Sequence, residues 1–356
     1  MVGRAARFGN AMSQASPHDP AHPPVSVFLT VLDEERHLAD VVAHIRAQDY
    51  SGDLQIVIAV GPCHDRTRQI ADEIAAADPR IQVVDNPTGL IAPGLNLAIS
   101  KAEHDILVRV DGHAMIPPDY VSAAVAELLG SGADNVGGIM AAEGETDFER
   151  TVARAMTTRL GVGSATFHTG GGAGPALTVY LGTFRRSAVV GVGGYDETML
   201  RAEDWELNHR IRRNGGVIWF TPTLRVSYRP RHSLSALARQ YFFYGRWRRE
   251  LMRRHPETVS ARYLAPPMLV AALAGSTAVG VIGLAAHRRE LTAGLLLPAG
   301  YLAALLAGSV VTGRGLSARS AVALPAVYAT MHCAWGAGFL LSPGDLAERT
   351  DVAAVR

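Results

Sequence analysis

The sequence predicts an α/β protein with a doubly wound, mainly parallel sheet, followed by C-terminal transmembrane helices. Two observations lead to this prediction. From residue 25 to about residue 226, short β-branched runs alternate with amphipathic stretches, a pattern typical of repeated βαβ units. After residue 263 the chain changes to long apolar stretches without acidic or basic side chains, which is typical of membrane-spanning helices.

The first part of the chain supplies the elements of the sheet in order. We expect strands at residues 25–32, 54–60, 81–84 and 106–110, and helices at residues 34–48, 65–77 and 93–102. In an open parallel sheet the ligand site lies at the carboxyl ends of the strands. We therefore expect the functional residues to follow these strands.

Three C-terminal stretches, residues 264–286, 291–312 and 320–341, contain no Asp, Glu, Lys or Arg. Each reaches the length of about 20 residues that crosses a hydrocarbon core. We predict three transmembrane helices; buried core helices are the alternative. An arginine cluster precedes the first stretch, which places the α/β domain in the cytoplasm by the positive-inside tendency. The cluster consists of Arg246, Arg248, Arg249, Arg253, Arg254 and Arg262.

These features divide the chain into five parts. We expect a mobile leader at residues 1–24, which lack an apolar run of signal-peptide length. The α/β domain follows at 25–232 and an amphipathic interfacial segment at 233–262. Three transmembrane helices at 263–342 and a tail at 343–356 complete a multi-pass protein of the cell membrane. Arg288 and Arg289, in the loop opposite the cytoplasm, leave the side of the C-terminus open.

Composition excludes two classes of function. The 34 Lys and Arg residues balance the 33 Asp and Glu residues, whereas nucleic-acid-binding domains carry a basic excess. We therefore expect no nucleic-acid partner. The only two cysteines, Cys63 and Cys333, lie in regions of opposite character and predict neither a disulfide framework nor a zinc site.

An apolar run ends in Asp111-Gly112-His113. A carboxylate and an imidazole two positions apart, just past a strand, can hold one divalent cation such as Mg²⁺ or Mn²⁺. Such a cation would neutralise a diphosphate leaving group. The alternative is a turn-capping aspartate beside a surface histidine.

A second acidic pair, Glu203-Asp204, begins a segment with helical spacing. Acidic residues are common in the first turn of a helix, where they interact favourably with its dipole. The functional interpretation is a general base, in which one carboxylate takes the proton from an acceptor hydroxyl. The sequence alone leaves both interpretations open.

Residues 239–247 mix aromatic side chains with arginines directly before the first apolar stretch. Aromatic rings and arginines of this kind suit the membrane interface. A further role for Arg246 and Trp247 at the active site stays open.

The order of these motifs resembles the family 2 glycosyltransferases of the GT-A fold, over residues 25–247. Residues 30–34 match the family's motif at the end of the first strand, residues 111–113 match its D-x-D metal motif, and Glu203-Asp204 match its E-D motif. The resemblance implies a GT-A type sheet, a divalent metal on Asp111 and His113, and Asp204 as the base beside Glu203.

The resemblance also assigns the substrate-binding residues. We expect the nucleotide-sugar donor to be bound by Thr30, Leu32, Glu34, Asp65, Asn96, Arg109 and Asp111. We expect the acceptor or the membrane interface to be contacted by Tyr180, Trp205, Arg246 and Trp247.

Among subfamilies, the chain looks most like the succinoglycan-type exopolysaccharide glucosyltransferases, through residues 109–113 and 178–185. This likeness implies transfer from a nucleotide diphosphate sugar to a glycan or polyprenyl-linked acceptor in cell-surface or exopolysaccharide synthesis. A catalytically silent nucleotide-sugar-binding component of a membrane assembly is the alternative. A processive synthase and a transport subunit are further alternatives.

Two departures from the family pattern affect substrate and metal preference. Residues 60–63 replace an Asp-Asp-Gly-Ser turn, so the carboxylate that reads uracil is missing. His113 replaces the second acid of the metal motif.

Overall fold

A computed structural model describes residues 21–348 of the chain. Its eight strands form one sheet. The strands are β1 (Val25–Val31), β2 (Leu54–Val60), β3 (Ile81–Asp85), β4 (Ile106–Arg109), β5 (Asn135–Ala142), β6 (Gly174–Pro175), β7 (Tyr180–Arg185) and β8 (Ile218–Tyr228). The expected leader and tail lie partly outside the described residues.

The helices fall into two groups. Those packed around the sheet or next to it are α1 (Leu38–Arg46), α2 (Thr67–Ala77), α3 (Ile91–Lys101), α4 (Tyr120–Ser131), α5 (Asp147–Met156), α6 (Arg159–Val162), α7 (Thr166–Thr169), α8 (Arg186–Gly191) and α9 (Glu203–Arg213). Those that follow are α10 (Leu234–Arg254), η1 (Pro256–Thr258), α11 (Ala261–Ala285), α12 (Arg289–Thr292), η2 (Ala293–Leu295), α13 (Leu296–Thr312) and α14 (Ala318–Leu340).

The sheet has the order β3-β2-β1-β4-β7-β5-β8-β6. Its first four strands are parallel to one another, as the alternating pattern predicts, and β5 is parallel to β8. Strand β7 is antiparallel to both of its neighbours, β4 and β5. Helices α5 to α7 follow the carboxyl end of β5 and keep the chain at that edge of the sheet. Strand β7 therefore runs back across the sheet, in the direction opposite to β5. The mainly parallel GT-A type sheet is thus confirmed, with an antiparallel strand at its centre.

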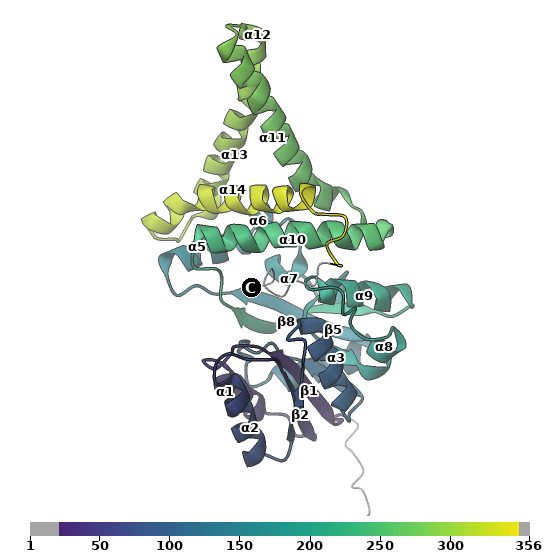
Figure 1. Ribbon diagram of the computed structural model, residues 1–356. Coiled ribbons are helices and arrows are strands. Elements are labelled where there is room, and N and C mark those ends of the chain that lie inside the picture. The colour runs from purple at the N-terminus through teal and green to yellow at the C-terminus, as the bar shows by residue number, and fades with distance from the viewer. Residues whose placement is uncertain (1–20, 349–356) are drawn as a thin grey trace, which may run out of the picture.

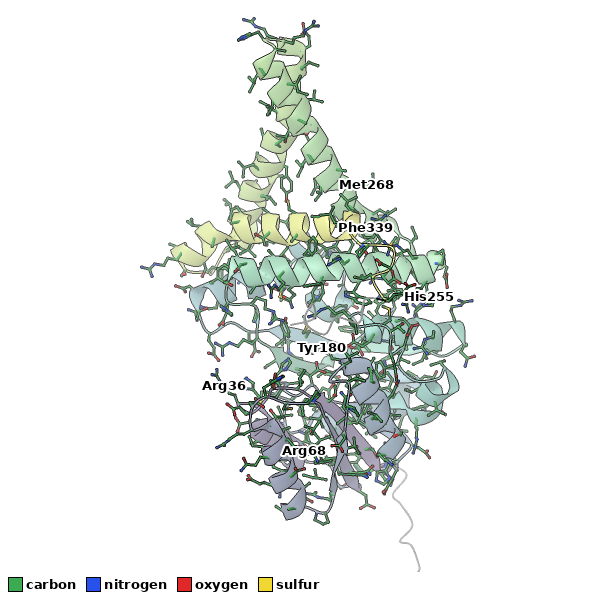
Figure 2. The ribbon with its side chains drawn as sticks, viewed as in Figure 1. Arg36, Arg68, Tyr180, His255, Met268 and Phe339 are labelled. Atoms are coloured by element: carbon green, nitrogen blue, oxygen red, sulfur yellow. The ribbon has the colours of Figure 1, made fainter. Side chains whose placement is uncertain are left out.

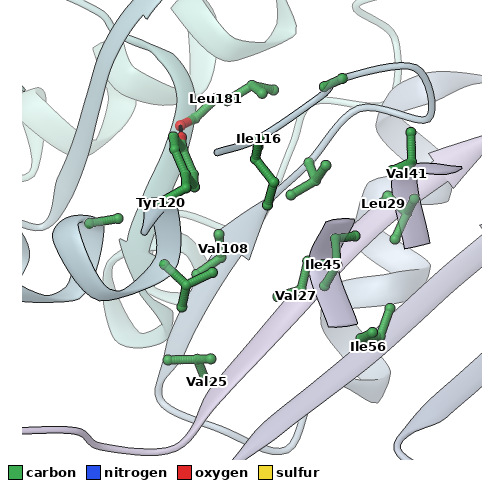
Figure 3. Packing of buried hydrophobic residues seen from close by; sticks show 14 of the residues in the cluster. Val25, Val27, Leu29, Val41, Ile45, Ile56, Val108, Ile116, Tyr120 and Leu181 are labelled. Atoms are coloured by element: carbon green, nitrogen blue, oxygen red, sulfur yellow. Dashed lines mark hydrogen bonds between the residues drawn. The ribbon is translucent and has the colours of Figure 1, made fainter. Parts of the chain in front are cut away.

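The core explains why β1 is an almost continuous apolar run. Val25, Val27 and Leu29 pack with α1 on one face of the sheet, as Figure 3 shows. Phe28 packs with the apolar cluster on the other face. The polar residues of β1, Ser26 and Thr30, hydrogen-bond to β2, and the rest of this strand, buried on both faces, is apolar. Full burial of each such side chain stabilises the fold by about 1.5–3 kcal/mol.

Helices α10 and α14 lie side by side between the sheet domain and the hairpin formed by α11 and α13 (Figure 1). Glycines allow this close approach: a Cβ on Gly245 would lie 1.9 Å from the carbonyl oxygen of Trp335, and one on Gly338 would lie 2.0 Å from that of Phe242. Arg249 donates hydrogen bonds to the carbonyls of Phe339 and Leu340 at the end of α14. The two helices therefore form one layer, which we call the α10–α14 platform.

The structure corrects the prediction of three transmembrane helices. Within residues 21–348, two helical stretches are long and apolar enough to cross a membrane, Ala261–Ala285 and Arg289–Thr312. Their side chains are largely exposed, as at Met268 on α11 (Figure 2). The third expected stretch forms α14, which is not one of these two. It buries Leu324, Tyr328 and Met331 against the protein, so one of its faces is covered by the enzyme.

Two glycine substitutions test the platform. Alanine is normally favoured over glycine in a helix by roughly 0.5–1 kcal/mol, and a Cβ on Gly300 of α13 would meet nothing within 4 Å. We expect Gly300→Ala to keep or raise the apparent melting temperature of the detergent-solubilised protein. Gly338→Ala should lower it, because overpacking costs about 1–3 kcal/mol. Equal melting temperatures for the two variants would contradict close packing of α10 on α14.

Candidate active site

A cavity of about 610 Å³ lies at the carboxyl ends of β1 and β4, beneath the α10–α14 platform. Most residues predicted for the site line it. These are Thr30, Leu32, Glu34, Arg109, Asp111, His113, Tyr180, Glu203, Asp204, Trp205 and Trp247. Motifs that are far apart in the sequence therefore meet at the edge of the sheet where a ligand site was expected.

Arg109, the last residue of β4, organises the acidic residues of the cavity. Its side chain is 5% exposed and contacts three carboxylates. The guanidinium donates to Asp204, and its Nη2 lies 3.1 Å from Asp111 and 3.4 Å from Glu203. The ring of Tyr195 covers the guanidinium at 5.8 Å. Arg109 thus joins the end of β4 to the start of α9.

Asp204 stands in the first turn of α9, immediately after an unusual backbone conformation. Ala202 has φ = 62°, in the left-handed region that costs a residue other than glycine free energy and often marks functional sites. Burial raises the pKa of Asp204 to about 7, and the charges of Glu203 and Asp111 add to this while Arg109 opposes it. A carboxylate with such a pKa can exchange a proton near neutral pH.

Asp111 and His113 offer an oxygen and a nitrogen to a cation in this cavity. Both bonds from Arg109 to Asp111 use Oδ1, so Arg109 does not occupy the second carboxylate oxygen. His113 Nδ1 lies 2.9 Å from Glu34 Oε1, and this hydrogen bond raises the pKa of His113. When Nδ1 donates to a carboxylate, Nε2 is left as a metal ligand. Two protein ligands plus substrate phosphates suit Mg²⁺ or a similar ion, so these residues fit a divalent metal.

Comparison with known proteins gives the family. Residues 26–191 match the family model described as Glycosyl transferase family 2. The chain is 32% identical over 317 residues to succinoglycan biosynthesis protein ExoA of Rhizobium meliloti (strain 1021), and the alignment covers 88% of this chain and 93% of that protein. The chain belongs to glycosyltransferase family 2. It is therefore a glycosyltransferase, as its motifs predict.

A solved structure supports the fold of this glycosyltransferase. The mannosyltransferase PcManGT from Pyrobaculum calidifontis, in complex with GDP-Man and Mn²⁺, aligns with a TM-score of 0.57 and 19% sequence identity. The alignment covers 92% of this chain and 90% of that one. At this identity the likeness shows the fold alone.

Three residues predicted for the glycosyltransferase site do not line this cavity. Asp65 accepts hydrogen bonds from Thr67 and from the backbone of Glu35, so it fixes the start of α2. Asn96 bonds to both backbone groups of Tyr195 and thereby holds the ring that covers Arg109. The guanidinium of Arg246 lies over Phe242 and Phe243.

A second cavity, of about 700 Å³, lies between the sheet domain, α10, the start of α11 and α14. Sequence reasoning missed it. Tyr241, Tyr244 and Arg248 of α10 face it at positions i, i+3 and i+7, which mark one face of a helix. This spacing could have distinguished Arg248 from the other arginines of its cluster, because it places Arg248 on one helix face with Tyr241 and Tyr244.

Replacement of Arg109 tests its organising role. Loss of one partner from a buried ion pair costs about 3–5 kcal/mol, so we expect Arg109→Met to lower the free energy of unfolding by about this amount in denaturant titrations. Combination with Asp204→Asn should recover part of the loss, because one repelling carboxylate is removed. The control is Arg150→Met, since the exposed Arg150–Asp147 pair should contribute at most about 1 kcal/mol. Similar losses in the two single variants would contradict this role.

Proposed function

We propose that this chain is a membrane-anchored, inverting glycosyltransferase that uses a nucleotide diphosphate sugar. Its acceptor would be a glycan or a polyprenyl-linked saccharide in cell-surface or exopolysaccharide synthesis. The observation that carries the proposal is that Asp204, with a pKa near neutrality, lines one cavity with Asp111 and His113. The names of the two relatives support it, since one acts in succinoglycan biosynthesis and the other was solved with GDP-Man and Mn²⁺.

The chemistry is a single displacement. Asp204 accepts the proton of the acceptor hydroxyl, and the hydroxyl oxygen forms a bond to the anomeric carbon of the donor. The bond from that carbon to the diphosphate oxygen breaks on the opposite side, and the nucleoside diphosphate leaves with the bonding electrons. A divalent cation held by Asp111 and His113, Mg²⁺ or Mn²⁺, would supply positive charge to the leaving diphosphate.

Other residues position the two substrates. Arg109 orients the carboxylate of Asp204 toward the cavity, and Glu203 shares the same guanidinium. Thr30 and Leu32, at the end of β1, line the wall together with residues 89–91 at the start of α3. We assign this wall to the nucleotide. Tyr180, Trp205 and Trp247 line the same cavity, and we assign them to the sugars.

The membrane arrangement follows from the hairpin. Because α11 and α13 lead away from the platform and back to it (Figure 1), the catalytic domain and α14 lie on one side of the membrane. The hairpin tip carries Arg288, Arg289 and Glu290. The larger arginine cluster lies at the foot of the hairpin, which supports a cytoplasmic catalytic domain.

Asp204→Asn tests the catalytic assignment. We expect purified Asp204→Asn to lose transfer from any accepted nucleotide sugar by at least about 100-fold, since general base catalysis contributes at least that much. In the unsubstituted enzyme, kcat/KM should fall as pH drops below about 7, because Asp204 must be unprotonated to act. Binding of the donor should be largely retained. Normal turnover in Asp204→Asn would reject Asp204 as the base, and donor binding without turnover in the unsubstituted enzyme would favour the silent component.

Glu34→Ala tests the metal assignment. Loss of the carboxylate that orients a ligating histidine typically lowers metal affinity about 10–100-fold. We therefore expect a higher Mn²⁺ concentration for half-maximal transfer in Glu34→Ala, and a smaller change in Glu34→Gln, which keeps an acceptor for His113 Nδ1. Glu35→Ala is the matched control, because Glu35 accepts from the backbone of Arg66 instead. An unchanged metal requirement in Glu34→Ala would contradict a metal on His113.

A further inference from the structure

We propose that Arg248 binds the phosphate of a membrane-embedded lipid phosphate or diphosphate that carries the acceptor sugar. This inference rests on the proposed function and chooses between its two classes of acceptor. The acceptor's phosphate would lie where the two cavities join, and its hydrocarbon chain would lie toward α11 and α14.

The two cavities share a wall, so the catalytic carboxylates are connected to the foot of the membrane helices. The residues that line both are Phe167, His168, Thr178, Trp205, Tyr244, Arg248, Tyr263 and Trp335. They come from the segment before β7 and from α9, α10, α11 and α14. In Figure 2, Tyr180 of the catalytic cavity lies below α10, and Met268 of α11 lies above α14. An acceptor that reached Asp204 along this path would pass the platform.

No carboxylate among residues 21–348 forms an ion pair with Arg248 at this junction. Its guanidinium carbon lies 4.4 Å from the ring centre of Trp205 and 3.8 Å from that of Tyr263. Its Nη1 atom is shielded from solvent and has no hydrogen-bond partner among the described residues. Burial lowers the pKa of Arg248 to about 10, and the positive charge of Arg262 adds to this effect. A shielded cation without an anion is costly to the fold, and an anionic ligand would remove that cost.

Three neighbouring arginines of α10 are satisfied by the protein, whereas Arg246, whose Nε has no hydrogen-bond partner among the described residues, lines neither cavity. Arg253 and Arg254 both bond to Glu250, and Arg254 also bonds to Asp196. Arg249 bonds to the carbonyls at the end of α14. Arg248 differs from all of them because it alone faces the two cavities.

A second polar group points to the same ligand. His168 lines both cavities, and its Nδ1 is buried without a hydrogen-bond partner among the described residues. Burial lowers the pKa of His168 to about 4, so the ring is neutral at physiological pH. A neutral imidazole can donate one N–H to a phosphate oxygen.

The far wall of the second cavity suits a hydrocarbon chain. Ala265 and Pro266 come from α11, and Met331 and Trp335 come from α14. Arg262 and Tyr263 stand at the start of the first membrane-spanning helix, where aromatic and basic residues mark the level of lipid headgroups. A water-soluble glycan would gain nothing from this apolar wall, whereas a lipid phosphate fits both the wall and the cation.

Arg248 is a binding residue in this proposal, since the reacting hydroxyl belongs to the sugar and the phosphate does not react. Its contribution can therefore be measured without turnover. The assay is binding of farnesyl diphosphate to the full-length protein in detergent, followed by intrinsic tryptophan fluorescence, because Trp205 and Trp335 line the cavity. EDTA is present so that no divalent cation draws the diphosphate to Asp111 and His113.

We expect Arg248→Gln to weaken farnesyl diphosphate binding about tenfold or more, as a charge-assisted hydrogen bond is lost. Arg249→Gln, the adjacent control outside both cavities, should leave it within about twofold. Farnesol should bind weakly and equally to all three proteins. Inorganic diphosphate at the same concentration should not compete.

Three outcomes would overturn the inference. The first is equal affinity of the Arg248 and Arg249 variants for farnesyl diphosphate. The second is competition by inorganic diphosphate as strong as that by farnesyl diphosphate. The third is equal affinity of the unsubstituted protein for farnesol and for farnesyl diphosphate. If Arg248→Gln does not fold, the unsubstituted protein still decides, because farnesyl diphosphate binding should weaken with added salt and farnesol binding should not. Failure of the proposed function would look different: transfer would be absent while binding still depended on Arg248.

Discussion

The buried ion cluster at Arg109 is the interaction on which the site depends. One guanidinium holds Asp111, from the loop after β4, and Glu203 and Asp204, from the first turn of α9. These segments are far apart in the sequence, and without the cation their carboxylates would repel one another. Asn96 extends the cluster, since it fixes Tyr195 over the guanidinium. A single cation among three carboxylates leaves the cavity with a net negative charge. This charge suits both a divalent metal and a carboxylate that exchanges protons near pH 7.

The platform connects the sheet domain to the apolar hairpin formed by α11 and α13. In the structure α10 and α14 cover the edge of the sheet where the cavity opens, and the hairpin leaves from the same layer (Figure 1). Close contacts at Gly245 and Gly338 hold the two helices of the layer together. The first helix of the hairpin also contributes to the site, because residues at the start of α11 form walls of the cavities.

The sequence alone predicted the elements and motifs that depend on local patterns. It did not predict the features of the site and of the helices that depend on tertiary contacts. Strands β1 to β4 and helices α2 and α3 follow from periodicity, and the acidic motifs follow from their spacing and the family resemblance. The role of Asp65 could not be read in this way, because its oxygens are taken by Thr67 and Glu35 in the folded chain. Composition likewise marked 320–341 as a membrane span, although its small and apolar residues pack on α10. The spacing of Tyr241, Tyr244 and Arg248 was visible, but only the fold shows which face meets a cavity.

Arg109 and Arg248 give the two ends of the connected cavities opposite charge. Arg109 is surrounded by carboxylates, whereas Arg248 stacks on Trp205 and Tyr263 and meets no anion among the described residues. The end near Asp204 is thus negative and the end near the membrane positive. A substrate complementary to this field has a neutral sugar at the negative end and a phosphate farther toward the lipid. Until a divalent cation and the donor diphosphate occupy that end, the same field disfavours the reverse orientation, because a phosphate beside Glu203 and Asp204 would meet like charge. If the acceptor is lipid-linked, as we propose, this charge pattern favours one direction of entry.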